Sequence, residues 1–144
     1  MKRRTFLAAG STVFVTSLLA KNPPLKLRVG VIGHTGRGNY GHGLDTVWLK
    51  VPETEIVAVA DPHENGLANA CKRLQTLNGF GDYRKMLRET KPDIVAVCPR
   101  HADQHHDMAL AAIEAGVRGI YIEKPFVRTP AEVDSLATAC KKHG

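Results

Sequence analysis

A glycine-rich turn early in the chain has the residue types of a phosphate-binding loop. Gly33 directly follows an apolar run at residues 27–32, and Gly36, Gly38 and Gly41 come soon after it. Glycine adopts backbone angles that a Cβ forbids, and it lets the main chain approach a pyrophosphate closely. The last three of these glycines also match the G-x-G-x-x-G spacing of dinucleotide-binding proteins. The turn therefore predicts a dinucleotide site.

An acidic residue at the end of the next apolar run supports this prediction. Asp61 follows residues 55–60, and a carboxylate at this place can accept hydrogen bonds from ribose hydroxyls. It lies farther from the glycines than the usual spacing of about 20 residues, which indicates an extended loop or helix. Asp61 would repel a 2′-phosphate and so favours NAD. NADP stays an alternative because three basic side chains could neutralise that phosphate: Arg37, Lys72 and Arg73.

A charged pair fixed by a proline ends the last apolar run. Glu123, Lys124 and Pro125 follow residues 119–122. In an open α/β sheet, ligands bind at the carboxyl ends of strands. A lysine there can orient or polarise a substrate oxygen, and a neighbouring carboxylate can tune its ammonium group. Lys124 is therefore the candidate catalytic residue, with a plain surface Glu–Lys pair as the alternative.

Histidines and aspartates gather after the third long apolar run. Histidine with carboxylate is a ligand set that metals use, but no second cluster completes a coordination shell, and Asp also caps helices. We expect no metal here and favour a loop that lines the cofactor crevice. The cluster consists of His101, Asp103, His105, His106 and Asp107.

Apolar runs alternate with helical patterns along the chain. Such alternation predicts an α/β fold with a parallel, doubly wound sheet of the Rossmann type. Since a further strand would normally follow the final helix, the fold is expected to be cut short before its last strands. We expect strands at residues 27–32, 55–60, 93–98 and 119–122, with a short one near 80–81, and helices at 40–50, 64–75, 83–89, 104–114 and 130–143.

The N-terminus has the features of an export signal. Residues 1–20 begin with a basic end that includes Arg3 and Arg4, and continue with a short apolar run. A twin-arginine signal has this form, which predicts transport by the twin-arginine machinery to the periplasm. Leu18 stands where a cleavage site prefers a small residue, so an uncleaved membrane tether is the alternative. Residues 21–25 are interpreted as a linker, and residues 26–144 as one domain.

Charge and cysteine content exclude several other classes. The chain has 20 basic and 14 acidic residues, but three of the basic ones lie in its first four positions. The remainder forms no basic run, so nucleic-acid binding is not expected. The three cysteines, Cys71, Cys98 and Cys140, have no C-x-x-C spacing, which excludes a disulfide framework and a cysteine-only zinc site.

Residues 26–144 resemble the N-terminal domain of the glucose–fructose oxidoreductase and inositol dehydrogenase family, Gfo/Idh/MocA. The resemblance implies that the glycines hold the pyrophosphate, that Asp61 holds the adenosine ribose, and that Lys124 lies beside the nicotinamide and the reacting carbon. Three features in order carry the resemblance: Gly33 to Asp61, Pro99 to His105, and Glu123-Lys124-Pro125. With the loop analysis it gives the expected cofactor-binding residues: Gly33, Thr35, Gly36, Arg37, Gly38, Asp61, Pro99, His105, Glu123 and Lys124.

The family resemblance also implies an activity. It is hydride transfer between a nicotinamide and a carbohydrate-like or cyclitol-like alcohol, with the substrate held by a second domain that has no counterpart here. The full-length form could be a homo-oligomer. The alternative to this oxidoreductase is a non-catalytic nucleotide-binding module or an inactive truncated fragment.

Overall fold

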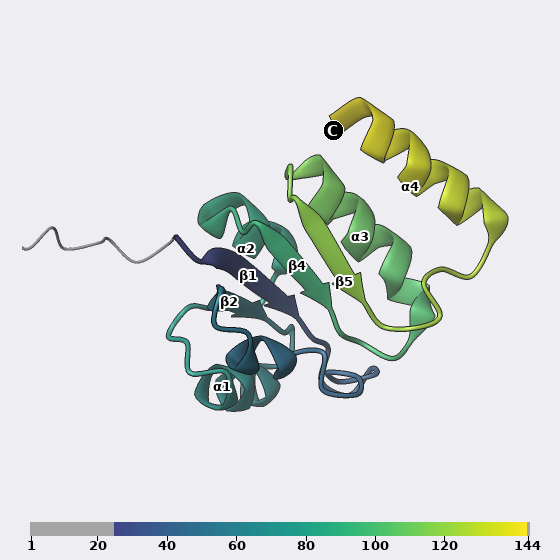
Figure 1. The fold of residues 1–144 in the computed structure, drawn as a ribbon. Helices are drawn as coiled ribbons and strands as arrows, with labels where there is room; N and C mark the ends of the chain where they lie inside the picture. Colours follow the sequence, from purple (N-terminus) through teal and green to yellow (C-terminus); the bar gives the residue numbers. More distant parts are fainter. Residues whose placement is uncertain (1–24, 144) are drawn as a thin grey trace, which may run out of the picture.

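A computed structural model describes residues 25–143 of the chain. Its centre is one sheet with the strand order β3-β2-β1-β4-β5, in which every neighbouring pair is parallel (Figure 1). This is the doubly wound order: β2 and β3 are added on one side of β1, and β4 and β5 are added on its other side, so the strand order reverses between β1 and β4. The predicted Rossmann-type sheet is confirmed. The strands are β1 (Leu27–Ile32), β2 (Thr54–Ala60), β3 (Gly79–Phe80), β4 (Ile94–Val97) and β5 (Gly119–Ile122).

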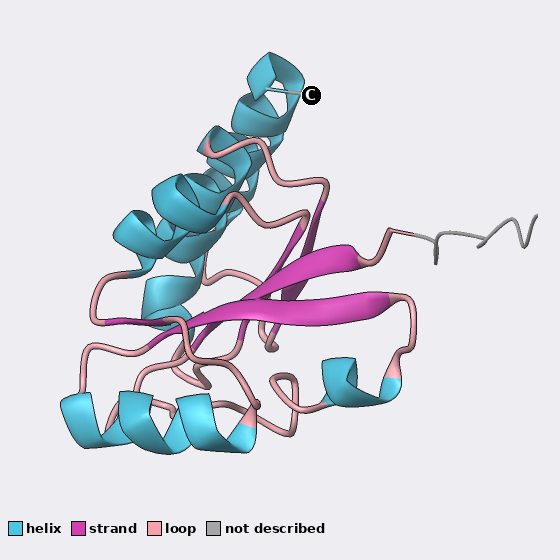
Figure 2. Cartoon of the chain, turned by 90° about the vertical axis from the view of Figure 1, so that its left-hand side faces the viewer, coloured by secondary structure: helices cyan, strands magenta, loops and turns pink. Residues whose placement is uncertain are grey.

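Helices cover both faces of the sheet (Figure 2). Strands buried on both faces are rich in Val and Ile because neither side meets water. Val31 and Val59 belong to the core on one face, and Ile32 and Val95 belong to the core on the other. The last helix packs against the one before it (Figure 1). The helices are α1 (Glu64–Arg73), α2 (Tyr83–Thr90), α3 (His105–Glu114) and α4 (Pro130–His143), with two short 3₁₀ helices, η1 (Val47–Lys50) and η2 (Ala102–Gln104).

The predicted helix at residues 40–50 is wrong. Only η1 (Val47–Lys50) is helical, and turns occupy residues 40–46. Gly41 and Gly43 have φ angles of 60° and 85°, which lie in the left-handed region that an α-helix does not use. The other predicted helices are present within a few residues of their expected bounds, and the short strand near 80–81 is β3.

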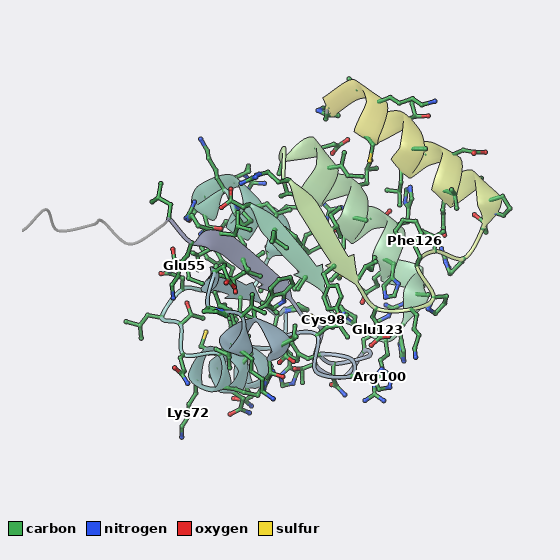
Figure 3. All side chains as sticks on the ribbon, in the orientation of Figure 1. Glu55, Lys72, Cys98, Arg100, Glu123 and Phe126 are labelled. Atoms are coloured by element: carbon green, nitrogen blue, oxygen red, sulfur yellow. The ribbon has the colours of Figure 1, made fainter. Side chains whose placement is uncertain are left out.

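The pairing of β1, β4 and β5 brings three chain segments to one edge of the sheet. Ile32 pairs with Val97, which pairs with Ile122. The residues that directly follow these three strands therefore lie at the carboxyl edge, where doubly wound folds bind ligands. Figure 3 shows Cys98, Arg100 and Glu123 at this edge.

The predicted export signal, residues 1–20, and most of the predicted linker lie outside the described residues. Within residues 25–143, no helix has the length and apolar character needed to span a bilayer.

Candidate functional site

The glycine loop, residues 33–46, leaves the carboxyl end of β1 as a series of turns. The backbone N–H of Gly33 donates to Ala60 O at 2.9 Å, so the start of the loop is fixed to the end of β2. His34 and Asn39 then pair across a tight turn that has Gly36 at its tip. Gly36 has a φ of 82°, and no described atom lies within 4 Å of the position where its Cβ would be. The tip is therefore open to a ligand.

The loop also contacts the residues that follow β4. Arg100 N donates to Gly38 O at 3.1 Å, and a Cβ at Gly38 would clash with the backbone of Arg100 and His101. Arg37 forms an ion pair with Asp103. These contacts lie across the reversal point between β1 and β4, so the predicted residues Gly38 and Arg37 belong to the ligand-binding edge. Arg37 reaches a cofactor phosphate only by leaving Asp103.

Asp61 is fully buried and holds the glycine loop in place. Its two carboxylate oxygens accept hydrogen bonds from Thr35 N at 3.0 and 3.2 Å, Thr35 Oγ1 at 2.6 Å, Tyr40 Oη at 2.9 Å and His63 N at 2.9 Å. These donors use the acceptor capacity of the carboxylate. A ribose hydroxyl can bind Asp61 only by replacing the hydroxyl of Thr35 or of Tyr40.

Tyr40 fills the space that Gly33 leaves free. A Cβ at Gly33 would clash with the Tyr40 ring. Burial, and then the charge of Asp61, raise the pKa of the Tyr40 phenol above its ordinary value of 10.0, so the hydroxyl stays neutral and donates. The Arg73 guanidinium lies 4.7 Å from the ring centroid and binds Asp45 at 2.7 Å. Arg73, a candidate to neutralise a phosphate, thus already has an anionic partner.

Glu123 connects the end of β5 to the glycine loop. Its side chain is only 3% exposed, and Oε2 accepts hydrogen bonds from His42 Nδ1 at 2.8 Å and from His42 N at 3.2 Å. Oε1 accepts from Lys124 N at 2.9 Å. Burial alone would raise the pKa of Glu123, but these hydrogen bonds outweigh it and hold the pKa below 4.5. The carboxylate is therefore ionised at neutral pH.

Lys124 is exposed at the carboxyl edge, directly after Glu123. Among the described residues it forms no ion pair. An ammonium group at this edge of the sheet, with no ion-pair partner among residues 25–143, can act on an incoming polar ligand. The catalytic role of Lys124 stays a prediction.

His105 is fully buried and connects two loops of the site. Its Nε2 lies 2.6 Å from Pro99 O, and its Nδ1 lies 2.7 Å from Pro125 O. Both ring nitrogens are thus used by backbone carbonyls. His105 was predicted to bind the cofactor, but in this position it acts on a ligand only through the two loops that it holds. Pro99, also buried, is one of the two residues it fixes.

The predicted histidine cluster is dispersed. His101 is exposed, whereas His106 bonds to Asp107 at 2.9 Å and to Ser135 at 3.0 Å. Within residues 25–143, no group of three or more His, Cys, Asp or Glu side chains is arranged to hold a metal ion.

A cavity of about 210 Å³ opens between the ends of β1 and β2 and the start of α3. Asp61 and Gly33 line it together with Tyr83 and Met108. Its aromatic and apolar walls, with the carboxylates of Asp61 and Asp82 beside them, suit an adenosine. The open tip at Gly36 suits the attached pyrophosphate, so the residues present fit a dinucleotide. A larger cavity of about 440 Å³ lies elsewhere, between α3, β5 and α4.

Two residues of this site were not predicted from the sequence. Tyr40 bonds to Asp61, and His42 bonds to Glu123, 81 positions away in the chain. A lone Tyr or His in a glycine-rich segment carries no motif. Only the fold brings these partners together.

The glycine loop, the cavity and the charged end of β5 define a dinucleotide-binding domain of the Rossmann type. Residues 27–144 match the family GFO_IDH_MocA, described as an oxidoreductase family with an NAD-binding Rossmann fold. The chain belongs to this family, and the predicted nicotinamide dinucleotide is the cofactor of this family's fold.

Solved structures with the same fold include several oxidoreductases. Myo-inositol 2-dehydrogenase from Lactobacillus plantarum is 28% identical, with a TM-score of 0.67 over 82% of this chain and 34% of that one. An NAD binding oxidoreductase from Klebsiella pneumoniae is 26% identical, with a TM-score of 0.63 over 83% of this chain and 32% of that one. The chain thus spans about a third of the length of these proteins. The comparison with curated proteins gave no match.

Proposed function

We propose that this chain is the nucleotide-binding part of an oxidoreductase that acts on a carbohydrate-like or cyclitol-like alcohol. The observation that carries the proposal is the exposed Lys124 next to the buried Glu123, at the same sheet edge as the glycine loop. When bound there, the nicotinamide accepts or donates a hydride. The likeness to a myo-inositol 2-dehydrogenase supports a polyol as the substrate class.

Each part of the site has a role in this reaction. Within residues 25–143, no acceptor takes the backbone N–H of Gly38 or Gly41, so these donors are free to bind the pyrophosphate. The cavity beside Asp61 receives the adenosine. The Lys124 ammonium binds the oxygen of the reacting carbon and stabilises negative charge that develops on it. Contacts that select the substrate come from outside this chain.

The test is NADH formation by the full-length protein, with myo-inositol and D-glucose as probes. We expect Lys124→Ala to lower kcat by a factor of about 100 or more, while the dissociation constant for NADH changes less than about threefold. Lys141→Ala, a matched change at an exposed lysine of α4, is the control and leaves both values unchanged.

The outcomes separate the oxidoreductase from its alternative. NADH binding without turnover of any polyol or sugar contradicts the oxidoreductase and favours a non-catalytic nucleotide-binding module. Turnover that survives Lys124→Ala contradicts the role given to this lysine.

We further propose that the protein is exported to the periplasm by the twin-arginine route. The support is the pair Arg3 and Arg4 ahead of a short apolar run within residues 1–20. Replacing both arginines with lysine should keep the protein in the cytoplasm, as measured by cell fractionation. Unchanged export of this double variant would contradict the proposal.

A further inference from the structure

We propose that Asp103 is an internal competitor of the cofactor. It holds Arg37 in the cofactor-free protein, and the pyrophosphate of a bound dinucleotide takes Arg37 from it. The inference rests on the proposed nucleotide-binding function. It assigns a role in cofactor affinity to an acidic residue that no motif marks, in the segment between Pro99 and His105.

The two partners of this ion pair come from segments on either side of the reversal point. Arg37 belongs to the turns after β1, and Asp103 belongs to η2, which follows β4. Because β1 and β4 are neighbours, with Ile32 paired to Val97, both segments leave the same edge of the sheet. A doubly wound fold binds its dinucleotide at this edge. The ion pair between Arg37 and Asp103 therefore spans the place where the cofactor binds.

Contacts on either side of the ion pair hold the two segments together. Arg100 N donates to Gly38 O at 3.1 Å, and Gln104 Oε1 lies 2.9 Å from His34 Nδ1. A surface ion pair usually contributes little, because ordering two long side chains costs entropy. Here the backbone segments that carry both side chains are already fixed to each other. The guanidinium therefore meets the carboxylate at a smaller entropic cost than in an isolated surface pair.

The turn that carries Arg37 is also braced within itself. Arg37 N donates to His34 O at 3.0 Å, and Gly36 N donates to Asn39 Oδ1 at 3.0 Å. The side chains of the ion pair nevertheless stay accessible, with exposed fractions of 52% for Arg37 and 31% for Asp103. A ligand in solution can therefore reach both partners.

The charges favour an exchange of partners when a dinucleotide binds. A guanidinium binds carboxylate and phosphate in the same forked geometry, but a pyrophosphate carries two negative charges and a carboxylate only one. The backbone donors of Gly38 and Gly41 hold the pyrophosphate as well. Among residues 25–143, no acid other than Asp103 forms an ion pair with Arg37. Asp103 therefore lowers cofactor affinity by the free energy of this one ion pair.

The competition affects only ligands that bring a phosphate group to the loop. Adenosine has none, and neither Arg37 nor Asp103 lines the cavity beside Asp61 that suits it. Its affinity is therefore independent of the ion pair. The affinities of NADH and of ADP-ribose, which both contain a pyrophosphate, include the cost of breaking it.

The test is a double-mutant cycle in the full-length protein, with Arg37→Ala, Asp103→Asn and the double variant. Asp107→Asn is the matched control, because it removes the same charge from an exposed acid that bonds to His106 on α3. Dissociation constants are measured by fluorescence for NADH, and by displacement of NADH for ADP-ribose and adenosine. Thermal unfolding verifies that each variant is folded.

We expect Asp103→Asn to bind NADH and ADP-ribose about two- to fivefold more tightly than wild type, the range of an exposed ion pair. Arg37→Ala binds both about tenfold or more weakly, because it loses a charged donor to the pyrophosphate. Asp103→Asn has no further effect once Arg37 is alanine, because the competition no longer exists. Adenosine binds equally to all variants, and Asp107→Asn behaves as wild type.

Several results overturn the inference. Equal tightening by Asp103→Asn with and without Arg37 contradicts it, because a general effect of charge then explains the change. Unchanged NADH binding in Asp103→Asn or in Arg37→Ala also contradicts it, and leaves the dinucleotide site standing. A folded wild-type protein that binds neither NADH nor ADP-ribose contradicts it together with the proposed function.

Discussion

The Tyr40 hydroxyl donates a hydrogen bond of 2.9 Å to the fully buried carboxylate of Asp61. This contact fixes the glycine loop to the end of β2 and makes Asp61 part of the loop's own framework. The acid that motif spacing assigns to ribose binding is therefore also the acid that shapes the phosphate-binding turn. We therefore expect loop conformation and cofactor binding to be coupled through Asp61.

Tyr40→Phe should destabilise the fold while leaving the ring contact with Arg73 intact. Losing one donor to a buried carboxylate costs about 1–3 kcal/mol, measurable as a lower urea midpoint. Tyr121→Phe, at a residue that is 46% exposed, is the control and should leave the urea midpoint unchanged.

The stability of Tyr40→Phe should also depend less on pH above 10 than that of wild type. The pKa of Tyr40 is raised in the folded protein, so the folded state favours the neutral phenol and wild-type stability falls as pH rises above 10. Tyr40→Phe should lack this contribution to the fall. An equal loss of stability with pH in both proteins would contradict the Tyr40–Asp61 contact.

Gly38→Ala should disrupt the loop much more than Gly36→Ala. Both glycines have positive φ, 90° and 82°, so both changes carry a backbone cost of about 1 kcal/mol. Only at Gly38 would the Cβ also collide with the backbone after β4. We expect a large loss of thermal stability and lost NADH binding for Gly38→Ala, and for Gly36→Ala only the smaller loss of stability that comes from its backbone cost. Equal effects at the two positions would contradict the loop packing.

Glu123→Gln should lower stability at neutral pH but not in acid. The pKa of Glu123 is held below 4.5 in the folded state. Its ionised form therefore contributes stability that is present above pH 4.5 and is lost as the pH falls through the lowered value. The difference in melting temperature between wild type and Glu123→Gln should shrink as the pH falls below 4.5. If the difference in melting temperature stays constant from pH 7 to pH 3, the charge of Glu123 does not contribute to the stability of the fold.

His105→Leu should loosen the residues around the Lys124–Pro125 bond. The change removes the ring that bridges the carbonyls of Pro99 and Pro125, and it leaves the buried carbonyl of Pro99 without its partner, at about 1–3 kcal/mol. Faster amide exchange at residues 123–128 would show the effect. His101→Leu, at an exposed position nearby, is the control for the change in residue type. Unchanged exchange in His105→Leu would contradict the role of His105 in holding the two loops.

Much of the fold could be predicted because it depends on local patterns. The continuous apolar runs of β1 and β2 indicate strands covered on both faces. The segment at residues 40–50 is not the predicted helix, although its apolar residues recur at helical spacing. Gly41 and Gly43 already adopt left-handed angles, and the contacts of Tyr40 and His42 hold the turns in place.

The site was predictable only in outline. Glycines, Asp61 and Lys124 are marked by motif spacing, and the fold places them along one sheet edge. The partnership of His42 with Glu123 depends on how the loop after β1 meets the end of β5, which no local pattern encodes. His105 is predicted at the cofactor from its position after β4, but its burial and its contacts with the carbonyls of Pro99 and Pro125 depend on packing that no local pattern encodes.

The measurement that tests the central claim most directly is a fluorescence titration of NADH into the full-length protein, beside the Gly38→Ala variant. The account predicts saturable binding by wild type, with a dissociation constant between about 1 µM and 1 mM, and binding at least tenfold weaker by the variant. Absence of NADH and NADPH binding by folded wild-type protein, or equal binding by the variant, would contradict a dinucleotide site on the glycine loop.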